Sequence, residues 1–243
     1  MQAQNLFREG KLSEAIASAA ALVRESPADA RLRTFLFELL CFAGEYDRAE
    51  KHLHLLGTGS GEKDREVGAL LYHAALHAER TRTEMFEKGE SPIASPAPEV
   101  GGVLNGRPFT TIEDADPRIG ARLEIFAAGN YMWLPFAHIA SIRMEPPRRL
   151  RDLLWAPVVL RTGPGFKGVE LGEVLLPALS PLSYRHADEA VRLGRLTVWE
   201  EQNGDPVPFG QKILLVDGEE FPILELRTLT IGPPENGGTD AAT

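Results

Sequence analysis

The chain has 243 residues, of which 43% are hydrophobic and 25% are charged, and these proportions are typical of a globular protein with a core of its own. They exclude a chain that is disordered throughout, a collagen-like protein and a disulfide-rich scaffold. Acidic residues outnumber basic residues by 35 to 26, and the net charge of −9 makes nucleic acid an unfavourable partner because phosphates carry the same sign.

Cysteine usage and the apolar pattern predict where the protein acts. Cys41 is the only cysteine, so the chain forms no internal disulfide, as is usual in a reducing compartment. The N-terminal residues do not resemble a signal peptide, and there is no run of about 18 apolar residues that would span a membrane. We therefore expect a cytoplasmic protein without a membrane partner.

The composition changes near residue 90 and predicts a multidomain chain, α followed by α+β. Residues 1–88 contain one proline, Pro27, whereas residues 103–243 contain fourteen of the eighteen. Between them lies a stretch rich in proline and glycine, GESPIASPAPEVGG, which is typical of a linker. We predict a helical domain at 1–88, a linker at 89–102, an α+β domain at 103–231 and a flexible tail at 232–243.

The first half contains an internal repeat. The segment Gly10–Ala15 (GKLSEA) recurs as Gly44–Ala49 (GEYDRA), an offset of 44 − 10 = 34 residues. Thirty-four residues is the period of the tetratricopeptide repeat, a helix–turn–helix unit. Glycine lets the first helix of each unit end in a tight turn, and Pro27 stops the second helix of the first unit. The spacing therefore predicts two tetratricopeptide-like units.

A longer helix is predicted after the second unit, from Glu62 to Lys88. Val67, Leu70, Leu71, Ala74, Ala75 and Ala78 recur at steps of three and four residues, which is typical of an amphipathic helix. Because no further helix follows before the linker, we expect this helix to cap the repeat array.

The second half is predicted to consist of short strands with little helix. Alternating segments include Arg122–Ile125, Leu196–Trp199 and parts of Ile223–Ile231. The turn dipeptides are Asn105-Gly106, Asn203-Gly204 and Asp217-Gly218, the last lying between the strand candidates Ile213–Val216 and Phe221–Leu226. Short helices are expected at Arg148–Leu154 and Ala187–Leu193. The pattern predicts a small α+β domain with a curled antiparallel sheet.

One glycine-rich segment and one histidine pair resemble ligand sites. Gly57–Asp64 (GTGSGEKD) is similar to a phosphate-binding loop, but Glu62 separates the last glycine from the lysine and the segment follows a helix. His73 and His77 would share a helix face and hold one metal ion, yet no third ligand is spaced to join them. We expect neither a cofactor nor a metal.

Two groups of residues contain the side-chain types of nucleophilic catalysis. Cys41 lies on the apolar pattern of the second repeat, without a histidine partner specified by the sequence. Ser183, His186 and Asp188 lie on one short segment, where they cannot adopt triad geometry. We therefore predict that the protein is not an enzyme.

Aromatic residues concentrate in two segments of the second half, Tyr131–Phe136 and Asp152–Trp155. They are interpreted in two ways. They build the core of a domain poor in long helices, or part of the set lines a groove for a partner, because Trp and Tyr favour interface centres.

Five segments together resemble the TagJ family, also called ImpE or SciE-type proteins, which are accessory proteins of bacterial type VI secretion systems. These segments are Trp133–Phe136, Arg151–Ala156, Leu176–Leu179, Arg192–Trp199 and Gly210–Lys212. Each motif is weak by itself, but the five occur in the family's order and spacing, and the resemblance extends over nearly the whole chain, from the repeat to Ile231. Ser180 departs from the pattern, which has an aromatic residue after the Pro-Ala-Leu run.

The resemblance implies a non-catalytic cytoplasmic adaptor. Members of the family bind the small subunit of the contractile sheath through a helix near that subunit's N-terminus, and they assist or tune recycling of the sheath by a Clp-type AAA+ unfoldase. An amphipathic helix in the concave face of a repeat array is a recurring mode of recognition. On this interpretation, the expected partner-binding residues are Phe7, Arg31, Thr34, Glu38, Cys41, Phe42 and Ala75.

Two other hypotheses remain open from the sequence. In the first, the α+β domain is an enzyme and the repeats are its targeting arm, with pairs such as Asp152 and Arg148 or Arg151 as candidates for its chemistry. In the second, the protein is a scaffold that only dimerises.

Overall fold

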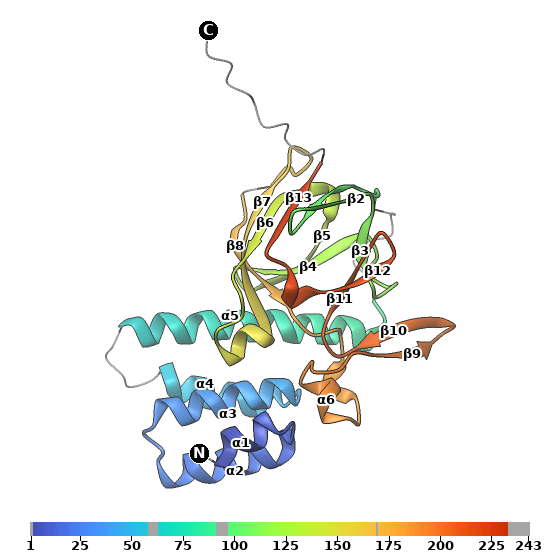
Figure 1. Cartoon of the computed structure of the whole chain (residues 1–243). Coiled ribbons are helices and arrows are strands. Elements are labelled where there is room, and N and C mark those ends of the chain that lie inside the picture. The colour runs from blue at the N-terminus through green and yellow to red at the C-terminus, as the bar shows by residue number, and fades with distance from the viewer. Residues whose placement is uncertain (1, 58–62, 91–96, 169, 233–243) are drawn as a thin grey trace.

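The computed structural model describes residues 2–57, 63–90, 97–168 and 170–232. Its helices form a layer on one side of the molecule, and antiparallel strands curl into a second body above them (Figure 1). This arrangement confirms the expected fold class, a tetratricopeptide-like helical region followed by a β-rich region. Among the described residues, no helix has both the length and the hydropathy needed to cross a membrane.

The helical layer contains the two predicted repeat units. Its members are α1 (Gln2–Arg8), α2 (Leu12–Glu25), α3 (Ala30–Phe42), α4 (Tyr46–Gly57) and α5 (Lys63–Lys88). The turn within each unit contains a glycine with positive φ, 85° at Gly10 and 69° at Gly44, a conformation that favours glycine. Asp29 begins α3, because its carboxylate accepts hydrogen bonds from the backbone N–H groups of Arg31 (2.8 Å) and Leu32 (3.2 Å).

Helix α5 joins the two parts of the molecule, which differs from the terminal cap that its pattern predicted. One side packs on α4, and its C-terminal half lies across β5 (Asn130–Pro135) (Figure 1). Arg82 is 3% exposed and Phe86 is 8% exposed because the sheet covers them. A terminal cap would expose this side to water. Instead, α5 packs between the other helices and the strands.

The remaining strands form one large and two small antiparallel sheets. The large sheet has eight strands in the order β2-β1-β13-β6-β7-β8-β4-β5, a second sheet has the order β12-β11-β3, and β9 pairs with β10 alone. The bounds are β1 Gly102–Leu104, β2 Arg107–Phe109, β3 Ile112–Asp114, β4 Arg122–Ala127, β6 Ile139–Met144, β7 Trp155–Thr162, β8 Gly172–Pro177, β9 Val198–Gln202, β10 Asp205–Phe209, β11 Ile213–Val216, β12 Glu219–Pro222 and β13 Thr228–Ile231.

The three predicted turn dipeptides each connect a hairpin: β1 to β2, β9 to β10 and β11 to β12. The second strand of the last hairpin ends earlier than predicted, because Ile223–Glu225 forms a short 3-10 helix, η4. The helix expected at Arg148–Leu154 is also a 3-10 turn, η2 (Leu150–Leu153), and the one at Ala187–Leu193 is shorter, α6 (Glu189–Arg192). Two further 3-10 turns are η1 (Phe136–His138) and η3 (Ser183–Arg185).

Two large hydrophobic cores hold the described part of the molecule together. One lies inside the curled sheet, where Leu214 and Ile112 of the three-stranded sheet meet residues of the eight-stranded sheet. The other begins among the helices and continues into the sheet body, because Phe126, Leu154 and Trp155 belong to it. The aromatic rings of Phe37 and Trp155 are 6.4 Å apart across this boundary. The helices and the sheet therefore share apolar packing.

Candidate functional site

Helices α3, α4 and α5 line an open groove of about 460 Å³, which we call the α3–α5 groove. Its lining residues are Ala30, Arg31, Thr34, Phe35, Glu38, Leu53, Leu56, Gly68, Ala69 and Tyr72. Most of these are apolar or small, as in grooves that receive the apolar face of a helix. Three residues predicted to contact a partner, Arg31, Thr34 and Glu38, are among them.

The α3 wall of the groove is a single stripe of side chains. Arg31, Thr34, Phe35 and Glu38 occupy positions i, i+3, i+4 and i+7, which fall on one face of a helix. Seven residues of helix rise about 10 Å, so the stripe matches about two turns of a bound helix. Arg31 is exposed at one end and Glu38 is 7% exposed at the other.

The α5 wall is built from small residues and one tyrosine. A Cβ atom added at Gly68 would meet no atom within 4 Å, so this backbone faces open space in the groove. Ala69 follows it, and Tyr72 lies one turn of helix after Gly68. Small side chains let another helix approach the backbone closely. This wall thus leaves room for a partner where a larger residue would fill the groove.

Glu38 has an unusual electrostatic position for a groove residue. Its Oε1 accepts a hydrogen bond of 2.8 Å from the Tyr72 hydroxyl. Burial raises the pKa of the Glu38 carboxyl to about 7, and the hydrogen bond from Tyr72 and the charge of Arg151 offset only part of this effect. The free groove therefore holds a carboxyl group that changes its charge near neutral pH.

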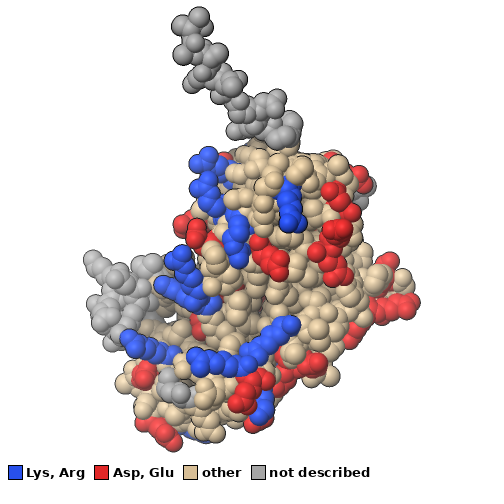
Figure 2. Space-filling model, in the orientation of Figure 1, with Lys and Arg blue, Asp and Glu red and all other residues tan. Residues whose placement is uncertain are grey.

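The sheet body contributes a basic rim beside Glu38. The guanidinium of Arg151, in η2, lies 5.4 Å from the centre of the Tyr72 ring, and Arg148 and Arg149 just before it are exposed. Figure 2 shows Lys and Arg side chains gathering across the boundary between the helices and the sheet on the face in view. The groove thus has a mainly apolar lining, one carboxyl group and a basic border.

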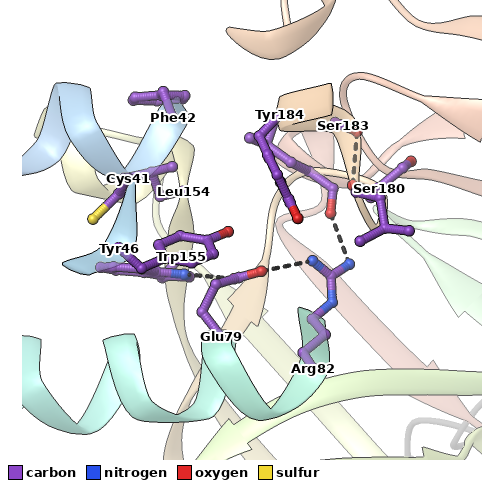
Figure 3. Close-up of a pocket in the computed structure, with 12 residues that line it drawn as sticks. Cys41, Phe42, Tyr46, Glu79, Arg82, Leu154, Trp155, Ser180, Ser183 and Tyr184 are labelled. Carbon is purple, nitrogen blue, oxygen red and sulfur yellow. Dashed lines mark hydrogen bonds and ion pairs between the residues drawn. The ribbon is translucent and has the colours of Figure 1, made fainter. Parts of the chain in front are cut away.

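Four other residues predicted to bind a partner lie outside the groove. Cys41 is 4% exposed, Phe42 1% and Ala75 3%, so all three are packed in the helical core. Figure 3 shows Cys41 and Phe42 beside a cavity of about 20 Å³ at the boundary with the sheet body, a space for about one water molecule. Phe7 is half-buried and packs edge-on against the ring of Phe35, 6.2 Å away.

Their burial has a physical reason. Helix α3 lies between α2 and α4 and also meets η2 of the sheet body, so its last turn, from Leu39 to Phe42, is buried. The sequence pattern placed Cys41 and Phe42 on the first helix of a repeat, whose concave side is open in an isolated array. The sheet body closes that side here.

The aromatic segments of the second half mainly build the molecule. Phe136 is fully buried, Trp155 is 3% exposed and Trp133 is 8% exposed. Tyr131 and Met132, with Trp133, also border a surface hollow of about 340 Å³ beside α5. Core packing is therefore the main role of these residues, and the partial exposure of Tyr131 and Met132 leaves a second, shallower surface.

The candidate nucleophiles are engaged in structural contacts. The Ser183 hydroxyl donates to the Ser180 carbonyl (2.7 Å) and accepts from the Gly210 N–H (2.8 Å). His186 accepts from the Asp188 N–H through Nδ1 (3.0 Å), and its Nε2 lies 3.3 Å from Glu200. Burial raises the pKa of the Cys41 thiol well above its usual value, which keeps it in the unreactive protonated form.

The other candidate sites are structural or lie beyond the described chain. Asp152 caps η2, because its carboxylate accepts from the backbone N–H groups of Arg148 and Arg149, both at 2.9 Å. Within the described ranges, His73 and His77 belong to no group of three or more potential metal ligands. The glycine-rich segment that resembled a phosphate loop lies mostly outside the described residues.

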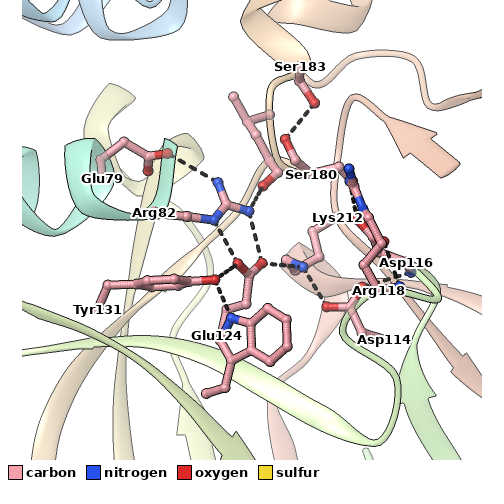
Figure 4. Close-up of polar contacts among 12 residues, drawn as sticks. Glu79, Arg82, Asp114, Asp116, Arg118, Glu124, Tyr131, Ser180, Ser183 and Lys212 are labelled. Atoms are coloured by element: carbon pink, nitrogen blue, oxygen red, sulfur yellow. Dashed lines mark hydrogen bonds and ion pairs between the residues drawn. The ribbon is translucent and has the colours of Figure 1, made fainter. Parts of the chain in front are cut away.

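A buried ionic network, which sequence reasoning missed, fixes α5 to the sheet body (Figure 4). Arg82 donates two hydrogen bonds of 2.8 Å to Glu124, one of 3.1 Å to Glu79 and one of 2.9 Å to the Leu179 carbonyl. Lys212 lies 2.6 Å from Glu124 and also binds Asp114. These cations overcome the effect of burial and hold the pKa of Glu124 below its usual value.

Residues of the sheet body also hold the glycine turns of the two repeat units. Arg195 donates to the backbone carbonyls of Phe7 and Arg8 at the end of α1, the latter at 2.7 Å. The ring of Tyr184 covers the turn at Gly44 so closely that a Cβ there would overlap it. These contacts, with the network, fix the orientation of the groove relative to η2.

The segments that carried the resemblance supply much of this junction. Trp133 donates to Tyr131, whose hydroxyl donates to Glu124 (2.6 Å), and Trp155 donates to Glu79 (2.9 Å). Leu179, Arg195 and Lys212 come from the other segments. In the sequence, these five segments were the available signal that residues far apart in the chain form one junction.

Comparisons with known proteins agree with this architecture. Residues 106–230 match the model of the ImpE protein family, and residues 6–71 match a tetratricopeptide-repeat model. The chain is 31% identical to the type VI secretion system accessory component TagJ of Pseudomonas aeruginosa, over 97% of this chain and 92% of that protein. The crystal structure of protein VPA1032 from Vibrio parahaemolyticus shares the fold, with a TM-score of 0.72, 24% identity and coverage of 96% of this chain and 98% of that one.

Proposed function

Because the chain belongs to the TagJ/ImpE family of type VI secretion accessory proteins, we propose that it is a non-catalytic adaptor that binds the small subunit of the contractile sheath. The α3–α5 groove receives a helix near the N-terminus of that subunit. In this role the protein acts in the cytoplasm and assists or tunes recycling of the sheath by a Clp-type AAA+ unfoldase.

The observation that carries the proposal is the groove itself. It lies in a repeat region of a type that commonly mediates contacts between proteins, it is about two helical turns long on its α3 wall, and its lining is mostly apolar. The candidate nucleophiles and the Asp152–Arg pairs have structural partners, which supports an adaptor over an enzyme in the sheet body.

The proposal is tested by isothermal titration of the protein with a synthetic peptide covering the N-terminal helix of the cognate sheath small subunit. We expect one-to-one binding with a negative heat-capacity change, because apolar surface is buried. The variant Gly68→Leu fills the groove from the α5 wall while improving helix propensity by roughly 0.5–1 kcal/mol. It should abolish measurable binding.

Ala17→Leu is the matched control, because it adds a similar side chain on an exposed position of α2 outside the groove. It should bind the peptide as the wild type does. If wild type binds neither the peptide nor the intact small subunit, the sheath-binding role is refuted. If Gly68→Leu binds normally, the helix docks at another surface.

A further inference from the structure

The position of Glu38 determines what kind of helix the groove accepts, and this argument rests on the proposed function. In the free protein, Glu38 is 7% exposed and lines the groove. A bound helix would displace the water that still reaches it. Covering an ionised carboxylate with apolar side chains is costly, unless the incoming surface supplies a hydrogen-bond donor or a positive charge.

Among the side chains that the structure describes, no cation pairs directly with Glu38. Within the part of the chain that the structure describes, the hydroxyl of Tyr72, on α5, is the one hydrogen-bond donor to the Glu38 carboxylate. From η2 and the residue before it, Arg151, Asp152 and Arg149 act on Glu38 through their charges. Arg151 stacks on the Tyr72 ring and lies 3.6 Å from Asp152, so its charge is already shared.

We propose that the bound helix carries a lysine or arginine on its apolar face and that this residue pairs with Glu38 and sets the register of the helix in the groove. Glu38 is the one acidic residue among the described residues that line the groove. It lies at the η2 end of the α3 stripe, so a single basic side chain has one matching place along about 10 Å of groove. Glu38 is thereby a specificity residue.

The exposed arginines in and beside the groove contribute less to the selection of the bound helix. Arg31 and Arg149 are exposed, so charges that they meet on a partner are screened by water and salt. Glu38 is buried, where an interaction with charge is stronger and an unpaired group is penalised more. A helix with only apolar residues opposite Glu38 should therefore bind more weakly than one with a basic residue there.

Proton release on binding follows from the same contact. Burial raises the pKa of Glu38 to about 7 in the free protein, so near this pH a substantial fraction of the molecules carries a proton there. A cation from the partner stabilises the ionised form and lowers the pKa of Glu38. Binding should therefore release protons near pH 7, and affinity should rise between about pH 6 and about pH 8.

The test is a double-mutant cycle with the sheath-helix peptide. The protein variants are Glu38→Gln, which keeps an acceptor for Tyr72 but removes the charge, and the control Glu14→Gln at an exposed position of α2. The peptide variants replace each Lys or Arg with Met in turn. Titrations at about pH 8 measure affinity, and titrations near pH 7 in two buffers of different ionisation enthalpy measure the protons released.

We expect Glu38→Gln to weaken binding of the unmodified peptide by about tenfold. One Met-substituted peptide should lose this preference and bind Glu38→Gln at least as tightly as the wild type, because covering the ionised carboxylate with an apolar side chain is costly. Proton release should disappear in Glu38→Gln and persist in Glu14→Gln. If the unmodified peptide binds but no substituted peptide couples to Glu38, this inference fails and the proposed function stands. If the unmodified peptide does not bind, both fail.

Discussion

Replacing Arg82 with Met should destabilise the whole protein, because Arg82 connects α5 to the sheet body. The change removes four hydrogen bonds, two of which go to Glu124, a residue with no exposed surface. Removing one partner of a buried ion pair costs about 3–5 kcal/mol, because the other charge stays buried with fewer partners. We expect a loss of this size at neutral pH.

Urea denaturation followed by circular dichroism measures this cost in Arg82→Met, Glu124→Gln and the double variant. The double variant should lose less than the sum of the two single variants, because the neutral amide no longer needs the cation. The control is Arg80→Met on the same helix, whose ion pairs with Asp47 and Glu50 involve exposed acids and should contribute about 1 kcal/mol or less.

The loss caused by Arg82→Met should also shrink in acid. In the wild type the pKa of Glu124 lies below its unfolded value, so the stabilisation is present above about pH 4.5 and is lost as the pH falls further. A cost below about 1 kcal/mol at neutral pH, or single-variant losses that simply add, would refute the view that the network joins the two parts.

Three further predictions concern single side chains, each read from denaturation curves. Glu38→Gln should gain stability relative to the wild type as the pH rises from about 5 to about 8, by up to about 3 kcal/mol, because folded Glu38 keeps a proton that the unfolded chain has released; parallel pH profiles would contradict this. Gly44→Ala should lower the free energy of unfolding by about 1–3 kcal/mol, because φ is positive there and the new Cβ overlaps the Tyr184 ring. An unchanged denaturation midpoint would show that neither the strain nor the overlap costs stability. Phe42→Ala should cost about 3–5 kcal/mol, because the ring is 1% exposed, and a normal midpoint would mean that the ring is not part of the core.

Local patterns predicted much of the fold because they reflect local physics. The repeated glycines at positions 10 and 44 both adopt positive φ in the helix-ending turns that their spacing indicated. Asp217-Gly218 forms the hairpin turn between β11 and β12. In contrast, residues 223–225 were expected to continue a strand, and their 3-10 conformation, with Ile223 buried, depends on tertiary packing.

The junction was not predictable from periodicity, because its partners are distant in the chain. Arg82 lies four residues after Ala78, on the side of the helix that the apolar stripe marks, but the pattern does not indicate its partner Glu124, which lies in a strand 42 residues later. For the same reason, Phe42 and Cys41 were assigned to an open concave face. Arg31, Thr34 and Glu38 line the groove because the sheet body does not cover the face of α3 that carries them.

The most direct test of the account is site-specific photo-crosslinking from inside the groove. A benzoylphenylalanine at Thr34, compared with the same residue at Ala17, reports which part of the intact sheath small subunit lies against each position. The account predicts an adduct from position 34 that maps to the subunit's N-terminal helix, no adduct from position 17, and loss of the first when Gly68→Leu is added. An adduct from position 34 that maps elsewhere on the subunit, or equal adducts from both positions, would contradict it.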